Sequence, residues 1–100
     1  MKIKIRGKNV TEMLSQMKHD GDREGTFKTY VEIPRWNNHF PITVRKIAFR
    51  WDLPIEINQE KGWFRKHLFI KAKGTERKLY HFLVDLKNFT SKYYPEAEEE

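Results

Sequence analysis

Residues 63–73 alternate between two kinds of side chain, and this period of two constrains the fold more strongly than any other feature of the chain. Successive side chains of a strand point to opposite faces of a sheet. One row can pack on a hydrophobic core and consists of Phe64, Lys66, Leu68, Ile70 and Ala72. The other row interleaves cations with aromatic rings and consists of Trp63, Arg65, His67, Phe69, Lys71 and Lys73. The pattern predicts a strand with one core-facing row and one basic, aromatic row.

Three further segments have the residue pattern of strands. They alternate between apolar and polar residues, and they span residues 2–6, 26–33 and 54–58. The third is followed by a turn at 59–62, which contains Gly62, and then by the strand at 63–73. Two strands joined by a short segment with a glycine predict a β-hairpin.

Two segments have apolar residues at the spacing of a helix, at residues 10–17 and 79–93. Asn9 and Glu12 form a capping box before the first helix. Thr75 is a suitable N-cap for the last helix, which we expect to bury one side of Tyr93. Both segments therefore carry a start signal as well as an apolar stripe.

Residues 41–53 fit two structures. A strand requires a bulge near Arg45 to keep its apolar residues on one face. A helix requires no irregularity, because one stripe then holds Phe40, Val44, Ile47, Ala48 and Trp51. We favour the helix. The segment Thr43–Pro54 also resembles the first helix of a helix-turn-helix, with Asp52 where a turn glycine is usual. That resemblance implies a second, DNA-reading helix after Pro54.

Together the patterns predict a single α+β domain over residues 1–94. Its small antiparallel sheet is packed on one face by two or three helices, in the order strand, helix, strand, helix, hairpin, helix. One hundred residues suit one domain. Residues 95–100 carry four acids, and we expect an acidic, disordered tail there.

The composition restricts the cellular setting. The chain has no cysteine, which fits a cytoplasmic protein without disulfides. No apolar run approaches the roughly 18 residues that cross a bilayer. We therefore expect a cytoplasmic protein that does not associate with membranes.

The charge distribution indicates a polyanionic partner. The chain has 20 Lys and Arg against 14 Asp and Glu, and four of the acids lie in the last six residues. The remainder is therefore more basic than the net charge of +6 suggests. Such a body attracts nucleic acid, because neutralising phosphates releases bound counterions.

We predict two separate nucleic-acid contacts, with DNA or RNA. On the strand face, cations follow the phosphates while Trp63 or Phe69 stacks on a base, unless the loop 35–40 or a helix covers these rings. At the start of the last helix, free backbone N–H groups and nearby cations hold a phosphate. The predicted site residues are Trp63, Arg65, His67, Phe69, Lys71, Lys73, Arg77 and Lys78.

No pattern of catalysis or metal binding competes with this interpretation. The four histidines fall in four different predicted elements, without the i, i+4 spacing of a helical zinc site. The chain also lacks a glycine-rich phosphate loop and the nucleophile motif of hydrolases. We expect no enzyme activity, metal or cofactor.

A second hypothesis is a protein-interaction module. A small regulator or viral inhibitor of this kind binds another protein's acidic or nucleic-acid-binding surface. Tryptophan dominates the energetic centres of protein interfaces. The candidate anchors are Trp36, Trp51 and Trp63.

Overall fold

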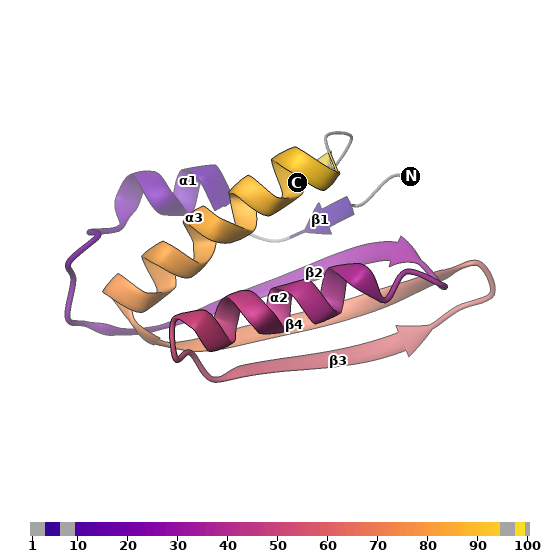
Figure 1. Cartoon of the computed structure of the whole chain (residues 1–100), viewed down its shortest axis with the longest axis horizontal. Coiled ribbons are helices and arrows are strands. Elements are labelled where there is room, and N and C mark those ends of the chain that lie inside the picture. Colours follow the sequence, from indigo (N-terminus) through magenta and orange to yellow (C-terminus); the bar gives the residue numbers. More distant parts are fainter. Residues whose placement is uncertain (1–3, 7–9, 95–97, 100) are drawn as a thin grey trace.

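The computed structural model describes residues 4–6, 10–94 and 98–99, and their arrangement confirms the α+β fold in one domain (Figure 1). The three longest strands run along the long axis of the molecule (Figure 1). The elements are β1 (Lys4–Arg6), α1 (Val10–Gln16), β2 (Glu24–Pro34), α2 (His39–Arg50), β3 (Ile55–Lys61), β4 (Arg65–Thr75), α3 (Glu76–Tyr93) and β5 (Glu98–Glu99).

The sheet has the strand order β3-β4-β2-β1-β5. Its centre is the antiparallel pair β2 and β4, which stays in register from Glu24 opposite Thr75 to Pro34 opposite Arg65. Strand β3 pairs antiparallel with β4 at one edge. On the other side, β1 pairs antiparallel with β2, and β5 lies parallel to β1. The unbroken β2–β4 ladder fixes which side chains of both strands face the same way.

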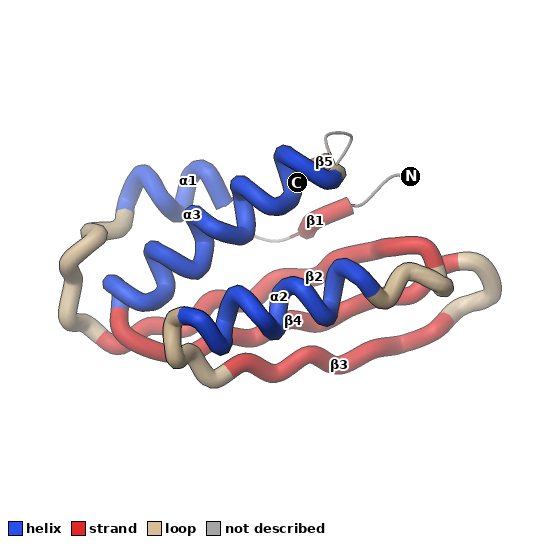
Figure 2. The backbone as a smooth tube through the Cα atoms, viewed as in Figure 1, coloured by secondary structure: helices blue, strands red, loops and turns tan. Residues whose placement is uncertain are grey.

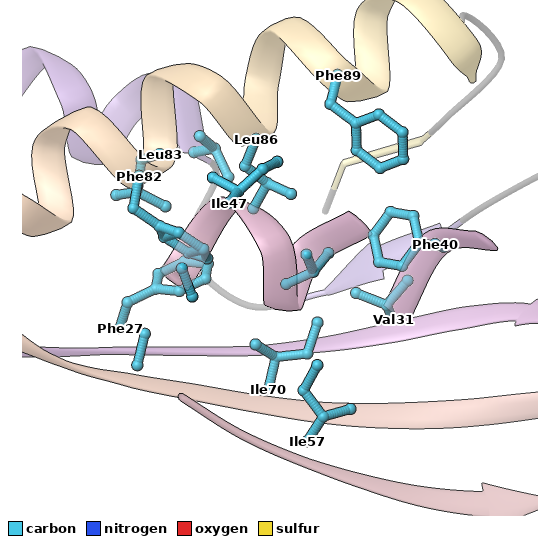
Figure 3. Close-up of a cluster of buried hydrophobic side chains, with 14 of the residues drawn as sticks. Phe27, Val31, Phe40, Ile47, Ile57, Ile70, Phe82, Leu83, Leu86 and Phe89 are labelled. Atoms are coloured by element: carbon cyan, nitrogen blue, oxygen red, sulfur yellow. The ribbon is translucent and has the colours of Figure 1, made fainter. Parts of the chain in front are cut away.

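Helices α2 and α3 cover one face of this sheet, and the hydrophobic core lies between them and the strands (Figures 2 and 3). Its side chains come from the apolar row of β2 and from the apolar stripes of the helices. Burying them is favourable because it removes apolar surface from water. The centre of the core consists of Phe27, Val31, Val44, Leu68, Ile70, Phe82 and Leu83. Helix α1 packs against α3 and contributes Val10, which is 2% exposed.

The predicted helix over residues 41–53 is present, but it spans His39–Arg50, so it begins slightly earlier and ends before residues 51–53. Its buried side carries Phe40, Val44, Ile47 and Ala48. After the helix, Asp52 adopts a left-handed conformation with φ 50°, which asparagine and aspartate tolerate better than most residues. Strand β3 follows instead of a second helix, so the implied helix-turn-helix is wrong.

The predicted hairpin is present, but its turn lies later in the chain than expected. Strand β3 continues through Gln59 to Lys61, and the turn comprises residues 62–64, closed by a bond from Gly62 N to Arg65 O at 2.7 Å. The sequence misled here because Gln59 is a polar residue on the core-facing row. It tolerates that position because this end of the edge strand β3 is exposed.

Both ends of α3 are as predicted, but the expected burial of Tyr93 is not found. Thr75 Oγ1 accepts a hydrogen bond from Lys78 N at 3.3 Å, which is the expected N-cap. At the other end, Tyr93 is 55% exposed, whereas Tyr94 is only 7% exposed. The Tyr94 hydroxyl accepts a bond from Asn37 Nδ2 at 3.3 Å. The buried tyrosine is therefore Tyr94, the residue that follows the last residue of the helix.

Two other expectations concern the ends of the chain and membranes. Asn9, of the predicted capping box, and most of the acidic tail lie outside the described residues. Within the tail, the backbone of residues 98–99 forms β5. None of the helices in the described part of the chain has the length and hydropathy that a bilayer crossing requires.

Candidate nucleic-acid interface

The second face of the sheet carries the basic, aromatic row predicted from the sequence. In the part of the chain that the structure describes, helices α1, α2 and α3 lie on the other side of the strands, so none of them covers it (Figures 1 and 2). On β4 this row runs through Arg65, His67, Phe69, Lys71 and Lys73, and Phe69 is 47% exposed. The β2 residues in register with it are Thr26, Lys28, Tyr30 and Glu32. We call these two rows, with their β3 neighbours Glu56, Asn58 and Glu60, the open face.

The aromatic centre of the open face consists of three rings. Tyr30 lies between Phe69 and His67, at 5.0 and 5.2 Å between ring centroids and with interplanar angles of 65° and 64°. Edge-to-face contacts of this kind hold rings in fixed orientations. Since Phe69 keeps almost half of its surface exposed, the cluster presents an ordered ring to solvent.

Beside the rings lies a group of lysines. Lys28 stands directly opposite Lys71 on the neighbouring strand, and Lys73 follows Lys71 on the same row. All three side chains are exposed, and none forms an ion pair with another described residue. Like charges directly opposite one another destabilise a sheet. The open face therefore concentrates positive charge at a cost to stability.

The row of cations is shorter than the sequence predicted. Arg65 Nε lies 2.8 Å from Glu32 Oε1, so its charge is already balanced. His67 stands in register between Glu32 on one side and Glu60 on the other. On the open face, the cations without an ion pair to a described residue are Lys28, Lys71 and Lys73, which we call uncompensated, although Glu56 lies in register with Lys71. The sequence contained a sign of these acidic neighbours. The alternation of residues 55–61 places Glu56 and Glu60 on the same face of β3, opposite to the face of Ile55 and Ile57.

Trp63 is not part of the open face. The residue lies in the turn after β3 and is 81% exposed, and at the rise of a strand it is roughly 20 Å from Phe69. Its neighbour Phe64 was predicted to face the core but is 68% exposed. Trp36 lies in the loop before α2 and is 71% exposed. A hydrogen bond from Arg35 N to Phe64 O, at 3.0 Å, joins this loop to the hairpin turn. We call Trp36, Trp63 and Phe64 the hairpin end.

Lys66 anchors the hairpin end from inside. It occupies the core-facing row of β4 with no exposed surface, and its Nζ donates to Asn38 Oδ1 at 3.0 Å. Burial, together with the nearby charge of Lys61, lowers the pKa of Lys66 because both disfavour the charged form. This lysine is a structural residue and does not face a ligand on the open face.

The expectation of free N–H groups at the start of α3 is wrong. The amides of residues 76 and 77 donate to carbonyl groups of the loop 21–23 at 2.8 and 3.0 Å. The amide of Lys78 donates to Thr75 Oγ1. The loop that leads into β2 thus occupies the groups that would hold a phosphate. Arg77 and Lys78 can contribute only their side-chain charges.

Of these two side chains, Lys78 lies beside the open face. It lines a shallow hollow, about 450 Å³ in volume, together with Lys73, and the hollow is also lined by Glu24, Asp52 and Thr75. Lys78 Nζ lies 3.6 Å from Asp52 Oδ2, an exposed carboxylate that compensates part of its charge. Arg77 is exposed and has no ion pair with a described residue.

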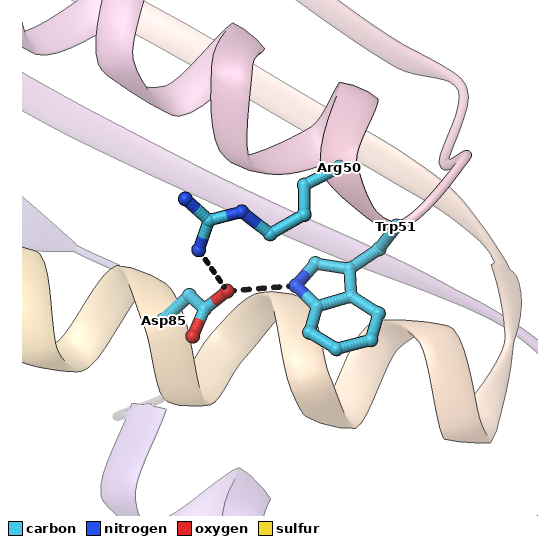
Figure 4. Close-up of polar contacts among 3 residues, drawn as sticks. All are labelled: Arg50, Trp51 and Asp85. Atoms are coloured by element: carbon cyan, nitrogen blue, oxygen red, sulfur yellow. Dashed lines mark hydrogen bonds and ion pairs between the residues drawn. The ribbon is translucent and has the colours of Figure 1, made fainter.

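Trp51, one of the candidate anchors, is engaged within the molecule. Figure 4 shows the Asp85 carboxylate accepting hydrogen bonds from Trp51 Nε1 at 2.8 Å and from Arg50 Nη1 at 3.1 Å. The indole also stacks on His81, with 4.6 Å between centroids and an interplanar angle of 16°. Trp51 therefore joins α2 to α3, whereas Trp36 and Trp63 stay exposed.

Among the described residues, no group of three His, Cys, Asp or Glu side chains is placed to hold a metal ion. Comparison with protein-family models, with curated protein sequences and with solved structures gives no match for this chain.

Proposed function

We propose that this chain is a small, non-enzymatic nucleic-acid-binding protein of the cytoplasm, and that the open face is its binding surface. The observation that carries the proposal is the ordered pair Tyr30 and Phe69 directly beside three uncompensated lysines. A surface under selection for stability alone would not place Lys28 opposite Lys71. A bound polyanion removes the repulsion between them.

The two parts of this surface suit the two parts of a nucleotide. Lysine side chains neutralise phosphates and release counterions, which supplies affinity without sequence preference. An exposed aromatic ring stacks on a base and contributes roughly 1–3 kcal/mol. Lys73 extends the phosphate contact toward Arg77 and Lys78, while Arg65 and His67 stay beside their acidic neighbours and contribute less.

The test is the salt dependence of binding, measured by fluorescence anisotropy with short labelled DNA and RNA at about 50 and 200 mM salt. We expect Lys71→Glu combined with Lys73→Glu to weaken binding and to reduce the slope of log affinity against log salt by about one to two. The matched control is Arg45→Glu with Lys46→Glu, the same charge change on exposed positions of α2.

The control separates a defined surface from a general attraction. Because α2 lies on the covered side of the sheet, its variant should retain most of the affinity and the salt slope. Equal losses in both variants would show that net charge alone binds the polyanion. No measurable binding of DNA or RNA by the unmodified protein would refute the proposal.

The hairpin end favours a second candidate function, a protein-interaction module. Trp36, Trp63 and Phe64 expose 71%, 81% and 68% of their surfaces, and a backbone hydrogen bond holds their two loops together. Fixed aromatic side chains of this kind are typical anchors of protein interfaces. The partner would be another protein's acidic or nucleic-acid-binding surface.

This candidate is tested with nuclease-treated extract and a double variant. We expect a stoichiometric protein to be retained by the unmodified chain and lost with Trp36→Ser and Trp63→Ser. Retention of the same protein by the double variant would remove the hairpin end as the interface. The Lys71→Glu with Lys73→Glu variant serves as the comparison, because it leaves the hairpin end unchanged.

A further inference from the structure

We infer that the open face selects single-stranded over double-stranded nucleic acid. This inference rests on the proposed function and adds the class of ligand. It follows from the layout of charges and rings across the three strands. The residues in register form successive rungs of the ladder, and each rung has its own chemistry.

The rungs change from acidic to aromatic to basic along β4. Glu60, His67 and Glu32 form the first rung. Asn58, Phe69 and Tyr30 form the second, and Glu56, Lys71 and Lys28 form the third. Lys73 lies beyond them, opposite Thr26. Rings and uncompensated cations therefore lie next to each other only over a short length of β4 and β2.

The rings of the second rung can be used only by an unpaired base. In a duplex the flat faces of the bases are stacked on one another, and only base edges are accessible in the grooves. Phe69, the more exposed ring, has no hydrogen-bonding group and therefore cannot read the base edges in a groove. A single strand can place a base against Phe69 and its phosphates on Lys71 and Lys73.

The acidic residues of β3 oppose a second phosphate backbone. Neighbouring strands of a sheet lie about 4.8 Å apart, so Glu56 and Glu60 closely flank the basic row of β4. The two backbones of a duplex are separated by a groove about 6 or 12 Å wide. A duplex with one backbone on Lys71 and the other toward β3 would bring phosphates to these carboxylates or past the edge of the sheet.

On the β2 side, the sheet continues into β1, whose Lys4 and Arg6 are in register with Glu32 and Tyr30. Lys28 is the one cation on the open-face row of β2, where its neighbours are Thr26 and Tyr30. The residues beyond Lys28 toward the start of β2 are Thr26 and Glu24. The preference for a single strand therefore comes from the rings and from the acidic residues of β3. A single strand places a base on the rings and two or three phosphates on the lysines.

The experiment compares three labelled probes by fluorescence anisotropy: an oligothymidylate of roughly ten nucleotides, the corresponding oligouridylate, and a DNA hairpin duplex of similar charge. We expect at least one single strand to bind about 10-fold more tightly than the duplex. The two single strands distinguish DNA from RNA. Phe69→Ala should remove most of the difference, because it weakens single-strand binding and leaves the weak duplex binding unchanged.

A second pair of variants tests the acidic flank. Glu56→Gln with Glu60→Gln should increase the affinity for the duplex several-fold and so reduce the ratio of single-strand to duplex affinity. Asp20→Asn with Asp22→Asn makes the same charge change outside the open face and should act on all probes alike.

The outcomes separate the inference from the proposed function. Salt-dependent binding with equal or tighter affinity for the duplex would overturn single-strand selection and leave the proposed function standing. Absence of binding to all three probes would overturn both. A preference for single strands that survives Phe69→Ala unchanged would also contradict the inference, because the ring would then play no part.

Discussion

The open face and the hairpin end both expose aromatic side chains, but their surroundings differ. On the open face, Phe69 is half exposed, is held against Tyr30, and has two uncompensated lysines on its own strand. At the hairpin end, Trp63 is far more exposed and contacts another ring, Phe64, with 6.2 Å between centroids. The lysine nearest this end on β4, Lys66, is buried beneath the surface.

The comparison teaches that exposure of a ring does not by itself indicate its ligand. A base needs a ring and a cation placed one nucleotide apart, which the open face provides along β4. A protein interface needs large aromatic side chains exposed near one another, and the hairpin end exposes Trp36, Trp63 and Phe64 on two loops joined by a backbone hydrogen bond. The two regions should therefore respond to different substitutions.

The largest expected difference is between Phe69→Ala and Trp63→Ala in nucleic-acid affinity. The first should weaken binding of a single strand by about 5- to 150-fold, the equivalent of roughly 1–3 kcal/mol of lost stacking. The second should leave affinity within about twofold. Anisotropy titrations measure both, and thermal unfolding confirms that each variant is folded. A larger loss with Trp63→Ala would reverse the assignment of the two regions.

A change in stability of similar size is expected at the hairpin end from Asn38→Ala. The substitution removes the acceptor of the buried Lys66 ammonium group and should lower the free energy of unfolding by about 1–3 kcal/mol. Asn38→Asp keeps an acceptor and adds a negative charge, so it should be neutral or stabilising. Urea denaturation measures both. Equal destabilisation by the two variants would show that the contact to Lys66 is not important.

A smaller effect with opposite signs is expected for Lys28→Gln. Removing one charge of the Lys28–Lys71 pair should raise the free energy of unfolding by roughly 0.2–1 kcal/mol. The same variant should weaken nucleic-acid binding and reduce its salt slope by about one. Denaturation and anisotropy on one preparation give both values. Loss of stability would contradict the view that this pair is retained for binding.

The smallest expected effect is a pH dependence of stability at the hairpin end. It is small because a single group, Lys66, contributes to it. The pKa of Lys66 in the folded protein lies below its ordinary value of 10.5, so the unfolded chain binds more protons between these two values. Stability from this group therefore rises as pH increases through that interval. Lys66→Met should remove this rise in urea denaturation, measured between neutral pH and about pH 10.

Much of the fold follows from local patterns, but parts of the site do not. The period of two in residues 65–73 correctly separated the row around Leu68 from the row around Phe69. The turn was misplaced because Gln59 lies on the core-facing row, where a polar residue normally ends a strand. What the alternation could not show is which neighbouring strand supplies Glu32 and Glu60 on either side of His67.

The hydrogen-bond partners of the amides at the start of α3 could not be predicted from sequence patterns either. Cations near Thr75 suggested a phosphate site, since the capped helix start should still have free N–H groups. Those groups are satisfied by the loop 21–23, more than fifty residues earlier in the chain. Such a contact depends on how the loop enters β2, which no local pattern records.

Strand β3 has a consequence for how copies of this protein behave toward one another. It is an edge of the sheet, so one side of its backbone has no partner strand in the order β3-β4-β2-β1-β5. An unpaired edge invites strand-to-strand association between molecules, and charged side chains along it discourage such pairing. Glu56, Glu60 and Lys61 are exposed on this edge. We propose that Glu56 and Glu60, beyond the role in ligand choice inferred above, oppose self-assembly, and neutralising them should then lower the concentration at which the protein aggregates.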